Sequence, residues 1–349
     1  MSFDCSGLKA YSGYYKDTQR LLQSASGGAA NVISEAIIKN GGVVFGACYS
    51  PDFRTAEFAC VESLEDLGRL KGSKYIPTLK RVLLDGEYVP LWPLVAEKLK
   101  EGREVLFTGL GCDVAALKSY LKANHVDSSR LYTVDLICFG PAIPEVHRQY
   151  VEALEKKYHS HLKSFTVRHK AKGWTPIHIR AEFENGREFL TPFYESDYGI
   201  AFSAYTREQC YKCKFKGTGH QSDITLGDFW GVYSEMAGWN KNGVSIFLVR
   251  SEKGEELLRK IDQQEFSLRP EDVNFAVEHN TMYYESRKKP ENYGKFGKFC
   301  DDLMSRGLHR AVMNQIGLKK YCKSLLKKFA VKILPAPALR MLKKFFRRK

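Results

Sequence analysis

Four of the nine cysteines stand where thiolates could bind a metal or carry out redox chemistry. Cys210 and Cys213 form a Cys-x-x-Cys pair, and this spacing lets two soft thiolates share a metal or iron-sulfur cluster, or form a redox disulfide. Cys112 and Cys138 fall at the ends of apolar runs, and strand ends at one edge of a sheet can converge. The spacing permits a four-cysteine site without requiring it, because a buried thiol in a tight turn would also explain Cys112.

Three short segments rich in Gly, Ser, Thr or Lys could hold an anionic group such as a phosphate. Residues 108–111 (Thr-Gly-Leu-Gly) join an apolar run to a helical one, where free amides and the helix dipole favour negative charge. Residues 24–28 (Ser-Ala-Ser-Gly-Gly) offer hydroxyls and amides, and Lys74 lies within residues 72–75 (Gly-Ser-Lys-Tyr). A tight turn, a helix cap and a solvated turn are the respective alternatives.

Residues 222–231 (Ser-Asp-Ile-Thr-Leu-Gly-Asp-Phe-Trp-Gly) gather two carboxylates and two aromatic rings around a short apolar run. Gly227 and Gly231 would allow a ligand to approach the backbone closely. A strand with an acidic turn residue at each end is the alternative. Because carboxylates, aromatic rings and glycines are concentrated in these ten residues, we expect the segment to contact a ligand.

Helices and short buried strands alternate in the first half of the chain. Residues 32–40 have helical apolar spacing and run into Asn40-Gly41-Gly42, which is a helix stop signal. Apolar β-branched and aromatic runs predict strands at 43–48, 105–107 and 133–138, and further helices are predicted at 113–123 and 144–157. This alternation predicts α/β structure.

From Ser164 onward the pattern changes to strands separated by turn signals such as Asn185-Gly186, which predicts antiparallel pairing. The predicted strands are 165–168, 177–180, 224–226 and 244–249. We therefore expect a fold between α/β and α+β with a mixed sheet. Its parts would be an α/β half (1–160), an antiparallel-rich half with the Cys-x-x-Cys pair (161–300), and a basic amphipathic helical tail (301–349).

The surplus of positive charge is confined to the end of the chain. Of the net charge of +14, all is accounted for after Asp302, because that segment holds 14 Lys and Arg and no Asp or Glu. A nucleic-acid enzyme would line its groove with such residues, so the neutral body is not expected to bind polyanions. The chain shows no membrane-spanning apolar run and no signal peptide, and its irregular cysteine spacing is unlike a disulfide framework. We expect a cytoplasmic globular protein.

The basic tail repeats apolar residues at helical spacing over 318–349, with Lys and Arg between them. Its apolar positions are Leu318, Tyr321, Cys322, Leu325, Phe329, Ile333, Leu339, Leu342, Phe345 and Phe346. Such a pattern is typical of a helix that lies on an anionic membrane surface. Packing of this helix on the body, or on an acidic partner, is the alternative.

Taken in order, these segments resemble the family of deazaflavin (coenzyme F420) hydrogenase and dehydrogenase beta subunits, in particular the bacterial branch encoded with surface-polysaccharide genes. The resemblance runs from about residue 15 to about residue 290 and includes Gly173-Trp174. It implies FAD, a 4Fe-4S cluster, and electron exchange between a ferredoxin-like carrier and an organic acceptor. It places flavin contacts at Ser26, Gly27, Gly28, Ser73, Lys74, Thr108 and Asp228, and cluster ligands at Cys112, Cys138, Cys210 and Cys213.

Three departures from the family pattern bear on the chemistry. The usual N-terminal ferredoxin module is missing, and only Cys5 lies upstream of the resemblance. Phe139 stands where the family commonly has a histidine, with Ala142-Ile143 in place of Pro-Ser, so a proton donor is lost. His220-Gln221 stands where an arginine is common, which weakens anion binding there.

Two functions therefore remain open at the level of sequence. The first is an FAD-dependent, iron-sulfur-assisted oxidoreductase that takes electrons from a ferredoxin-type partner. The second is a non-redox scaffold or assembly factor that keeps the fold at the membrane. In either case we expect a cytoplasmic protein, peripheral on the inner face of the membrane through residues 318–349, that works with polysaccharide-synthesis proteins and not with nucleic acid.

Overall fold

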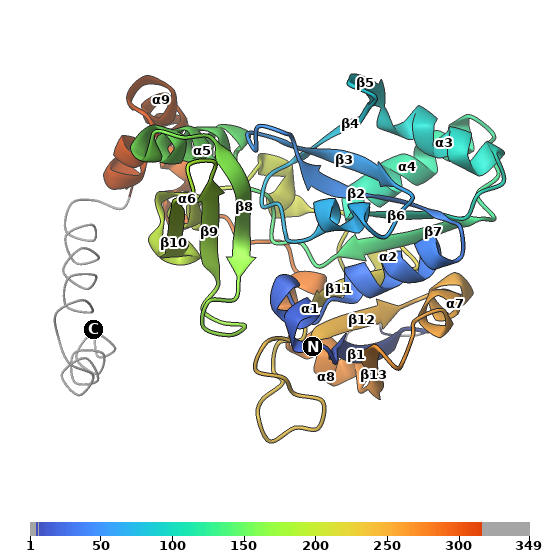
Figure 1. Cartoon of the computed structure of the whole chain (residues 1–349). Coiled ribbons are helices and arrows are strands. Elements are labelled where there is room, and N and C mark those ends of the chain that lie inside the picture. The colour runs from blue at the N-terminus through green and yellow to red at the C-terminus, as the bar shows by residue number, and fades with distance from the viewer. Residues whose placement is uncertain (1–4, 6, 316–349) are drawn as a thin grey trace.

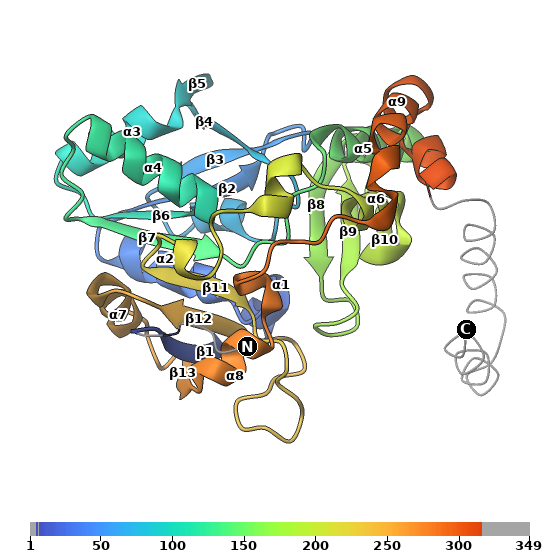
Figure 2. The same ribbon diagram turned by 180° about the vertical axis from the view of Figure 1, so that it is seen from behind.

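The computed structural model describes residue 5 and residues 7–315. In Figures 1 and 2 these residues form two lobes that lie side by side. The larger lobe is built on a ten-stranded mixed sheet, and the smaller on a three-stranded antiparallel sheet. The predicted tail over 318–349 lies outside the described residues.

The ten-stranded sheet has parallel strands at its centre and antiparallel strands toward its edges. Its order is β13-β1-β12-β11-β7-β6-β2-β3-β4-β5, and β2, β6, β7 and β11 run parallel to one another. The strands are β1 (Lys9–Tyr15), β2 (Val43–Tyr49), β3 (Ala56–Val61), β4 (Thr78–Leu84), β5 (Glu87–Pro90), β6 (Val105–Leu110), β7 (Leu131–Leu136), β11 (Ile224–Asp228), β12 (Ser245–Val249) and β13 (Phe266–Glu271).

Helices cover both faces of this sheet, which explains why its central strands are apolar at nearly every position. On one face lie α1 (Thr18–Gln23), α2 (Ala29–Lys39) and α7 (Glu252–Arg259), and on the other α3 (Leu91–Lys100) and α4 (Gly111–Ala123). Successive residues of β2 serve the two faces, because Val44 packs in the core under α2 whereas Val43 and Phe45 pack in the core under α3 and α4. Beyond them α8 (Val273–Glu278) packs against β1 and β12.

The smaller lobe is formed by the chain between β7 and β11, together with the end of the described chain. It contains α5 (Pro144–Tyr158), β8 (Leu162–His169), β9 (His178–Phe183), β10 (Glu188–Pro192), α6 (Asp197–Ala204) and α9 (Phe296–Arg306). Buried side chains from its helices and its sheet form one core, which includes Val151 of α5, Ile179 of β9, Tyr198 of α6 and Phe299 of α9. The turn between β9 and β10 holds Gly186 at φ 79°, as the Asn-Gly signal predicts.

The predicted fold class is confirmed, and the structure adds how the two sequence halves combine. β11 and β12 come from the antiparallel-rich half, yet they complete the same sheet as β2, β6 and β7. The strand predicted over 133–138 ends at Leu136, so Cys138 lies in the loop that follows. In the part of the chain that the structure describes, no helix is long and apolar enough to span a membrane.

Asp223 lies just before β11, where the chain returns from the smaller lobe to the large sheet, and it joins this segment to β7. Its Oδ2 accepts hydrogen bonds from the backbone N (2.7 Å) and Oγ1 (2.6 Å) of Thr133, and its Oδ1 accepts one from Ser251 Oγ (2.7 Å). The residue is 7% exposed. This carboxylate therefore pins β11 beside β7.

We expect Asp223→Ala to lower the free energy of unfolding by about 2–4 kcal/mol, because it leaves buried donors on Thr133 without an acceptor. Urea denaturation followed by circular dichroism measures the change. Asp127→Ala is the control, since Asp127 also accepts from a backbone N and a hydroxyl but lies exposed. An equal loss in both variants would contradict this role for Asp223.

Candidate functional site

Arg168, near the end of β8, reaches from the smaller lobe to the strand ends of the large sheet. Its Nη1 and Nη2 donate to the two carboxylate oxygens of Asp228 at 2.8 and 2.7 Å. Nη2 also donates to Ala25 O (2.9 Å) and Nη1 to Tyr75 Oη (3.3 Å). One guanidinium thus joins the three segments around residues 24–28, 72–75 and 222–231.

The Arg168–Asp228 pair is removed from water, with 9% and 13% of the two side chains exposed. Burial would lower the pKa of Arg168, but the carboxylate of Asp228 outweighs burial and the pKa is raised. Trp174 Nε1 donates to Asp228 Oδ1 at 3.1 Å, and Trp174 stacks on Trp230 with ring centroids 5.1 Å apart. Asp228 is therefore held in one orientation.

Lys170 is a second buried cation beside the loop of residues 24–28. Its Nζ donates to Leu21 O (2.8 Å) and Ser26 O (2.6 Å). Burial lowers its pKa to about 7, with a further contribution from the charge of Arg168 that Asp228 partly offsets. Lys170 can therefore change its protonation state near neutral pH.

The two predicted glycine positions are explained by packing within the protein. A Cβ atom on Gly27 would come within 2.1 Å of Gly13 O, and one on Gly28 within 2.4 Å of the Tyr15 ring. Gly27 N donates to Ser245 Oγ and Ser26 Oγ donates to Val244 O, both at 2.9 Å. A phosphate at this loop would consequently depend on the neighbouring cations more than on these hydroxyl and amide groups.

Lys74 makes internal contacts with the short helix Asp66–Leu70 and the residue that follows it. Its Nζ donates to Leu70 O (3.0 Å) and Lys71 O (2.9 Å), and burial lowers its pKa to about 8. The adjoining Ser73 is half-buried. Thr108 lies at the carboxyl end of β6 opposite Val134, and within the described residues no hydrogen bond links its side chain to Arg168 or Lys170.

The four predicted cysteines gather on the other side of the segment that leaves β7. Cys112 lies in the first turn of α4, and Cys210 and Cys213 lie within and just after the short helix Glu208–Lys212. The charge of a Cys138 thiolate would affect the pKa of Cys112, and those of Cys210 and Cys213 would affect Cys138. The structure thus brings the four thiols into one neighbourhood.

Positive charge and amide groups accompany these thiols. Gly140 N donates to Cys138 Sγ at 3.3 Å, which counteracts the rise in the pKa of Cys138 caused by burial. Lys216 Nζ donates to the carbonyl oxygens of Cys138 and Met282 at 2.5 Å and lies near the thiols of Cys138, Cys210 and Cys213. Burial followed by the Asp113 carboxylate raises the pKa of Cys112 to about 12.

The four thiols do not form a ready site for a single metal ion. Among residues 5 and 7–315, no three His, Cys, Asp or Glu side chains stand close enough to hold one such ion.

His220 stands where an arginine is common in the family, and its contacts are with other residues of the protein. Its Nδ1 bonds to Asp135 Oδ2 at 2.7 Å, and its ring stacks on Tyr283 with centroids 5.0 Å apart. Asp135 Oδ1 accepts a further hydrogen bond from Thr225 Oγ1 (2.5 Å). The buried Asp135–His220 pair ties the cysteine-bearing segment to β7.

A chain of aromatic contacts runs from the Arg168 cluster, which comprises Arg168, Asp228, Tyr75 and Lys170, to the residue next to Cys138. Tyr75 stacks on Phe202 with centroids 4.8 Å apart, and Phe202 meets Phe139 at 5.6 Å. Phe139, which adjoins Cys138, also contacts the Arg287 guanidinium at 4.6 Å from its ring centre. Aromatic side chains therefore connect the two predicted groups of site residues.

Arg168, Lys170 and Lys216 are the residues of these clusters that sequence patterns did not single out. Arg168 appears in the sequence only as the last residue of a predicted strand, and nothing local shows that it crosses to another sheet. Lys216 offered a weak signal, because it follows the Cys-x-x-Cys pair closely. Trp174 is indicated by the family resemblance alone.

We expect the Arg168–Asp228 pair to show strong energetic coupling. Arg168→Met should lower the free energy of unfolding by about 3–5 kcal/mol, because it leaves a buried carboxylate without a counter-charge. Adding Asp228→Asn to Arg168→Met should restore about 2 kcal/mol or more. Urea denaturation of the two single variants and the double variant measures the coupling, and additive losses would contradict it.

Comparison with known proteins matches part of this chain to a known family. Residues 102–273 match the family described as the C terminus of the beta subunit of coenzyme F420 hydrogenase/dehydrogenase. The chain is also similar to a chain of the F420-reducing nickel-iron hydrogenase complex from Methanosarcina barkeri, with a TM-score of 0.52 and 17% identity over 86% of this chain and 94% of that chain. At this identity the likeness concerns the fold.

The matched segment contains Arg168, Lys170, Asp228, Lys216 and all four predicted cysteine ligands. It begins before β6 and ends after β13, so it contains β6, β7 and β11 of the parallel centre, without β2, and the whole of the small sheet. Through residues 102–273, this chain belongs to the family of coenzyme F420 hydrogenase and dehydrogenase beta subunits.

Proposed function

We propose that this protein is an FAD-dependent, iron-sulfur-assisted oxidoreductase that acts on an organic acceptor. The observation that carries the proposal is the position of Arg168, which joins three predicted flavin segments beside four gathered thiols. Membership of a hydrogenase and dehydrogenase family supports a redox role.

In this proposal FAD binds against the Arg168 cluster. Lys170 and Lys74 would supply positive charge for its phosphates, and Asp228 would offer a fixed carboxylate to a polar donor of the cofactor. Arg168 would act by positioning, because it holds Asp228, Ala25 O and the Tyr75 hydroxyl at fixed places. Bound flavin would connect a one-electron carrier with a two-electron substrate.

Cys112, Cys138, Cys210 and Cys213 would hold a 4Fe-4S cluster. Burial raises the pKa of Cys112 and of Cys138, so ionised thiolates here need compensating positive charge, which a cluster and Lys216 would provide. The Gly140 N–H donates a hydrogen bond to Cys138 Sγ, and hydrogen bonds to ligand sulfurs affect the reduction potential of a cluster.

The setting of the reaction is also part of the proposal. We infer that a separate ferredoxin-type protein supplies electrons, since the other described cysteines, Cys5, Cys48, Cys60 and Cys300, lie far apart in the sequence. Phe139 cannot transfer a proton. In the Arg168 cluster, Lys170 is a group that can gain or lose a proton near neutral pH. A peripheral position on the inner face of the membrane, beside polysaccharide synthesis, would suit the basic tail.

A non-redox scaffold that keeps the family fold is the second candidate. Two observations favour it: the Ser26 hydroxyl and Gly27 amide are already engaged, and the described side chains form no single-ion site. This candidate would also place the protein at the membrane with polysaccharide-synthesis proteins. The two functions differ in whether cofactors bind.

Anaerobically purified or reconstituted protein should contain both flavin and iron, and single substitutions should remove them separately. We expect Cys210→Ser to lose iron and keep flavin, because its thiol lies in the cysteine cluster. Asp228→Asn with Lys170→Met should lose flavin and keep iron. Absorbance spectra and iron assays measure both, with Cys300→Ser as the control, and wild-type protein that takes up neither cofactor would favour the scaffold.

The affinity for FAD should depend on the protonation of Lys170. A bound phosphate favours the charged lysine and raises its pKa above about 7, so proton uptake accompanies binding and affinity falls as pH rises. The expected slope between pH 7 and 8.5 approaches about tenfold per pH unit. Fluorescence titration of wild type and Lys170→Met checks this: the variant should bind weakly at every pH, and an unchanged pH profile in the variant would exclude Lys170.

A further inference from the structure

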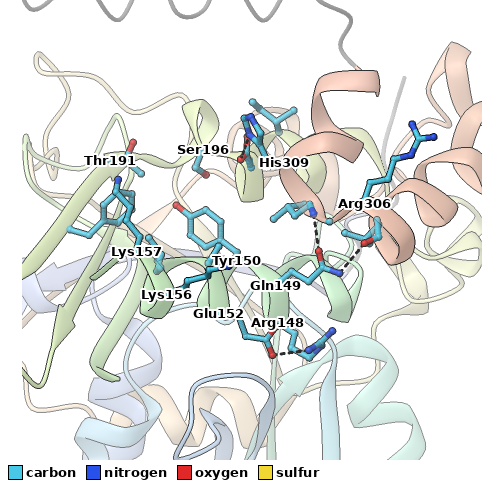
Figure 3. A pocket seen from close by; sticks show the side chains of 18 of the residues that line it. Arg148, Gln149, Tyr150, Glu152, Lys156, Lys157, Thr191, Ser196, Arg306 and His309 are labelled. Carbon is cyan, nitrogen blue, oxygen red and sulfur yellow. Dashed lines mark hydrogen bonds and ion pairs between the residues drawn. The ribbon is translucent and has the colours of Figure 1, made fainter. Parts of the chain in front are cut away.

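A cavity of about 730 Å³ opens in the smaller lobe between α5, β10, α6 and α9 (Figure 3). Its size falls within the usual range for small-molecule sites. None of the residues that line it belongs to the Arg168 or cysteine clusters. The proposed redox function therefore leaves this cavity unexplained.

The inner wall of the cavity is apolar. Tyr150 and Leu154 of α5, Leu303 of α9 and Leu308, which follows the end of α9, are buried and belong to the core of the smaller lobe. Met304 stands beside them with 70% of its surface exposed. The cavity thus offers a fixed hydrophobic wall and one flexible apolar side chain to an occupant.

The charged groups around the opening leave a surplus of positive charge. Its acidic groups Glu152 and Asp197 are paired, with Arg148 (2.7 Å) and His309 (3.0 Å) respectively, and Glu195 also lines the cavity. Arg306 lies 3.7 Å from Asp302. Lys156 and Lys157 are exposed on α5, and neither contacts a carboxylate within the described part of the chain. Lys157 Nζ lies 5.6 Å from the ring centres of Tyr158 and Phe189. Both ammonium groups therefore lack an acidic partner and can meet the anionic end of an occupant.

The position of the cavity in the chain indicates what occupant it meets. The described chain ends at Gln315, a few residues after Leu308 and His309, which line the cavity. Residues 316–349 contain many Lys, Arg, Leu and Phe residues and no Asp or Glu. Their positive charge would repel Lys156 and Lys157, so this tail is unsuited to fill the cavity. An anionic membrane that attracts the tail would be drawn to the same end of the molecule.

We propose that this cavity binds an anionic phospholipid, with the phosphate headgroup at Lys156 and Lys157 and an acyl chain along the apolar wall. The tail supplies general attraction to the membrane, and the cavity supplies contact with an individual lipid molecule. This site does not depend on the redox role, since it shares no residue with either cofactor cluster.

The test uses the full chain and dihexanoyl phosphatidylglycerol, a short lipid that dissolves as monomers, with binding measured by calorimetry. Below the concentration at which this lipid forms micelles, the tail has no membrane surface to bind. We expect Lys156→Glu with Lys157→Glu to weaken binding about tenfold or more, because two favourable charges become repulsive. Lys100→Glu with Lys122→Glu is the matched control, since it makes the same charge change at exposed positions of α3 and α4. It should shift the affinity less than about twofold.

A second variant tests the apolar wall without changing charge. Ala153 is exposed on α5 and lines the cavity, so Ala153→Trp should fill part of the space and weaken lipid binding while leaving the fold intact by circular dichroism. The proposal is overturned if the wild type does not bind the lipid, if both lysine pairs have the same effect, or if Ala153→Trp binds as the wild type does. Equal affinity for inorganic phosphate would also overturn it, because the site would then be a simple anion site.

Discussion

The ion pair between Arg168 and Asp228 is the constraint on which the rest of the candidate site depends. Arg168 comes from the smaller lobe and Asp228 from the end of a central strand of the large sheet, so their bidentate contact sets how the two lobes meet. A planar guanidinium can hold a carboxylate, a carbonyl and a hydroxyl at once, which a lysine at this position could not do. The same side chain also donates one hydrogen bond to each of the loops around residues 25 and 75.

The cost of burying these charges explains other features of the site. Burial lowers the pKa of both Lys170 and Lys74. Lysines with lowered pKa values are common at functional sites, so their presence favours a site that receives negative charge from a ligand. The cysteines show the converse case. Burial raises the pKa values of Cys112 and Cys138, and the Lys216 ammonium supplies positive charge near Cys138.

Much of the fold could be predicted because its determinants are local. The helix that ends at Asn40 and the strands at Val43 and Val105 follow from apolar periodicity and glycine stop signals. The site could be predicted only in part, since Ser26, Lys74 and Asp228 stand in recognisable segments whereas Arg168 acts through contacts far apart in sequence. The pairing of β11 and β12 within the ten-stranded sheet could not be predicted for the same reason. The alternation of apolar residues within a strand does not determine which strands pair with it.

Iron-edge anomalous diffraction from crystals grown anaerobically with FAD would test the central claim most directly. The account predicts an iron peak among the thiols of Cys112, Cys138, Cys210 and Cys213, and flavin density against Arg168 and Lys170. Iron bound elsewhere, or flavin density away from the Arg168 cluster in a protein that binds both cofactors, would contradict it.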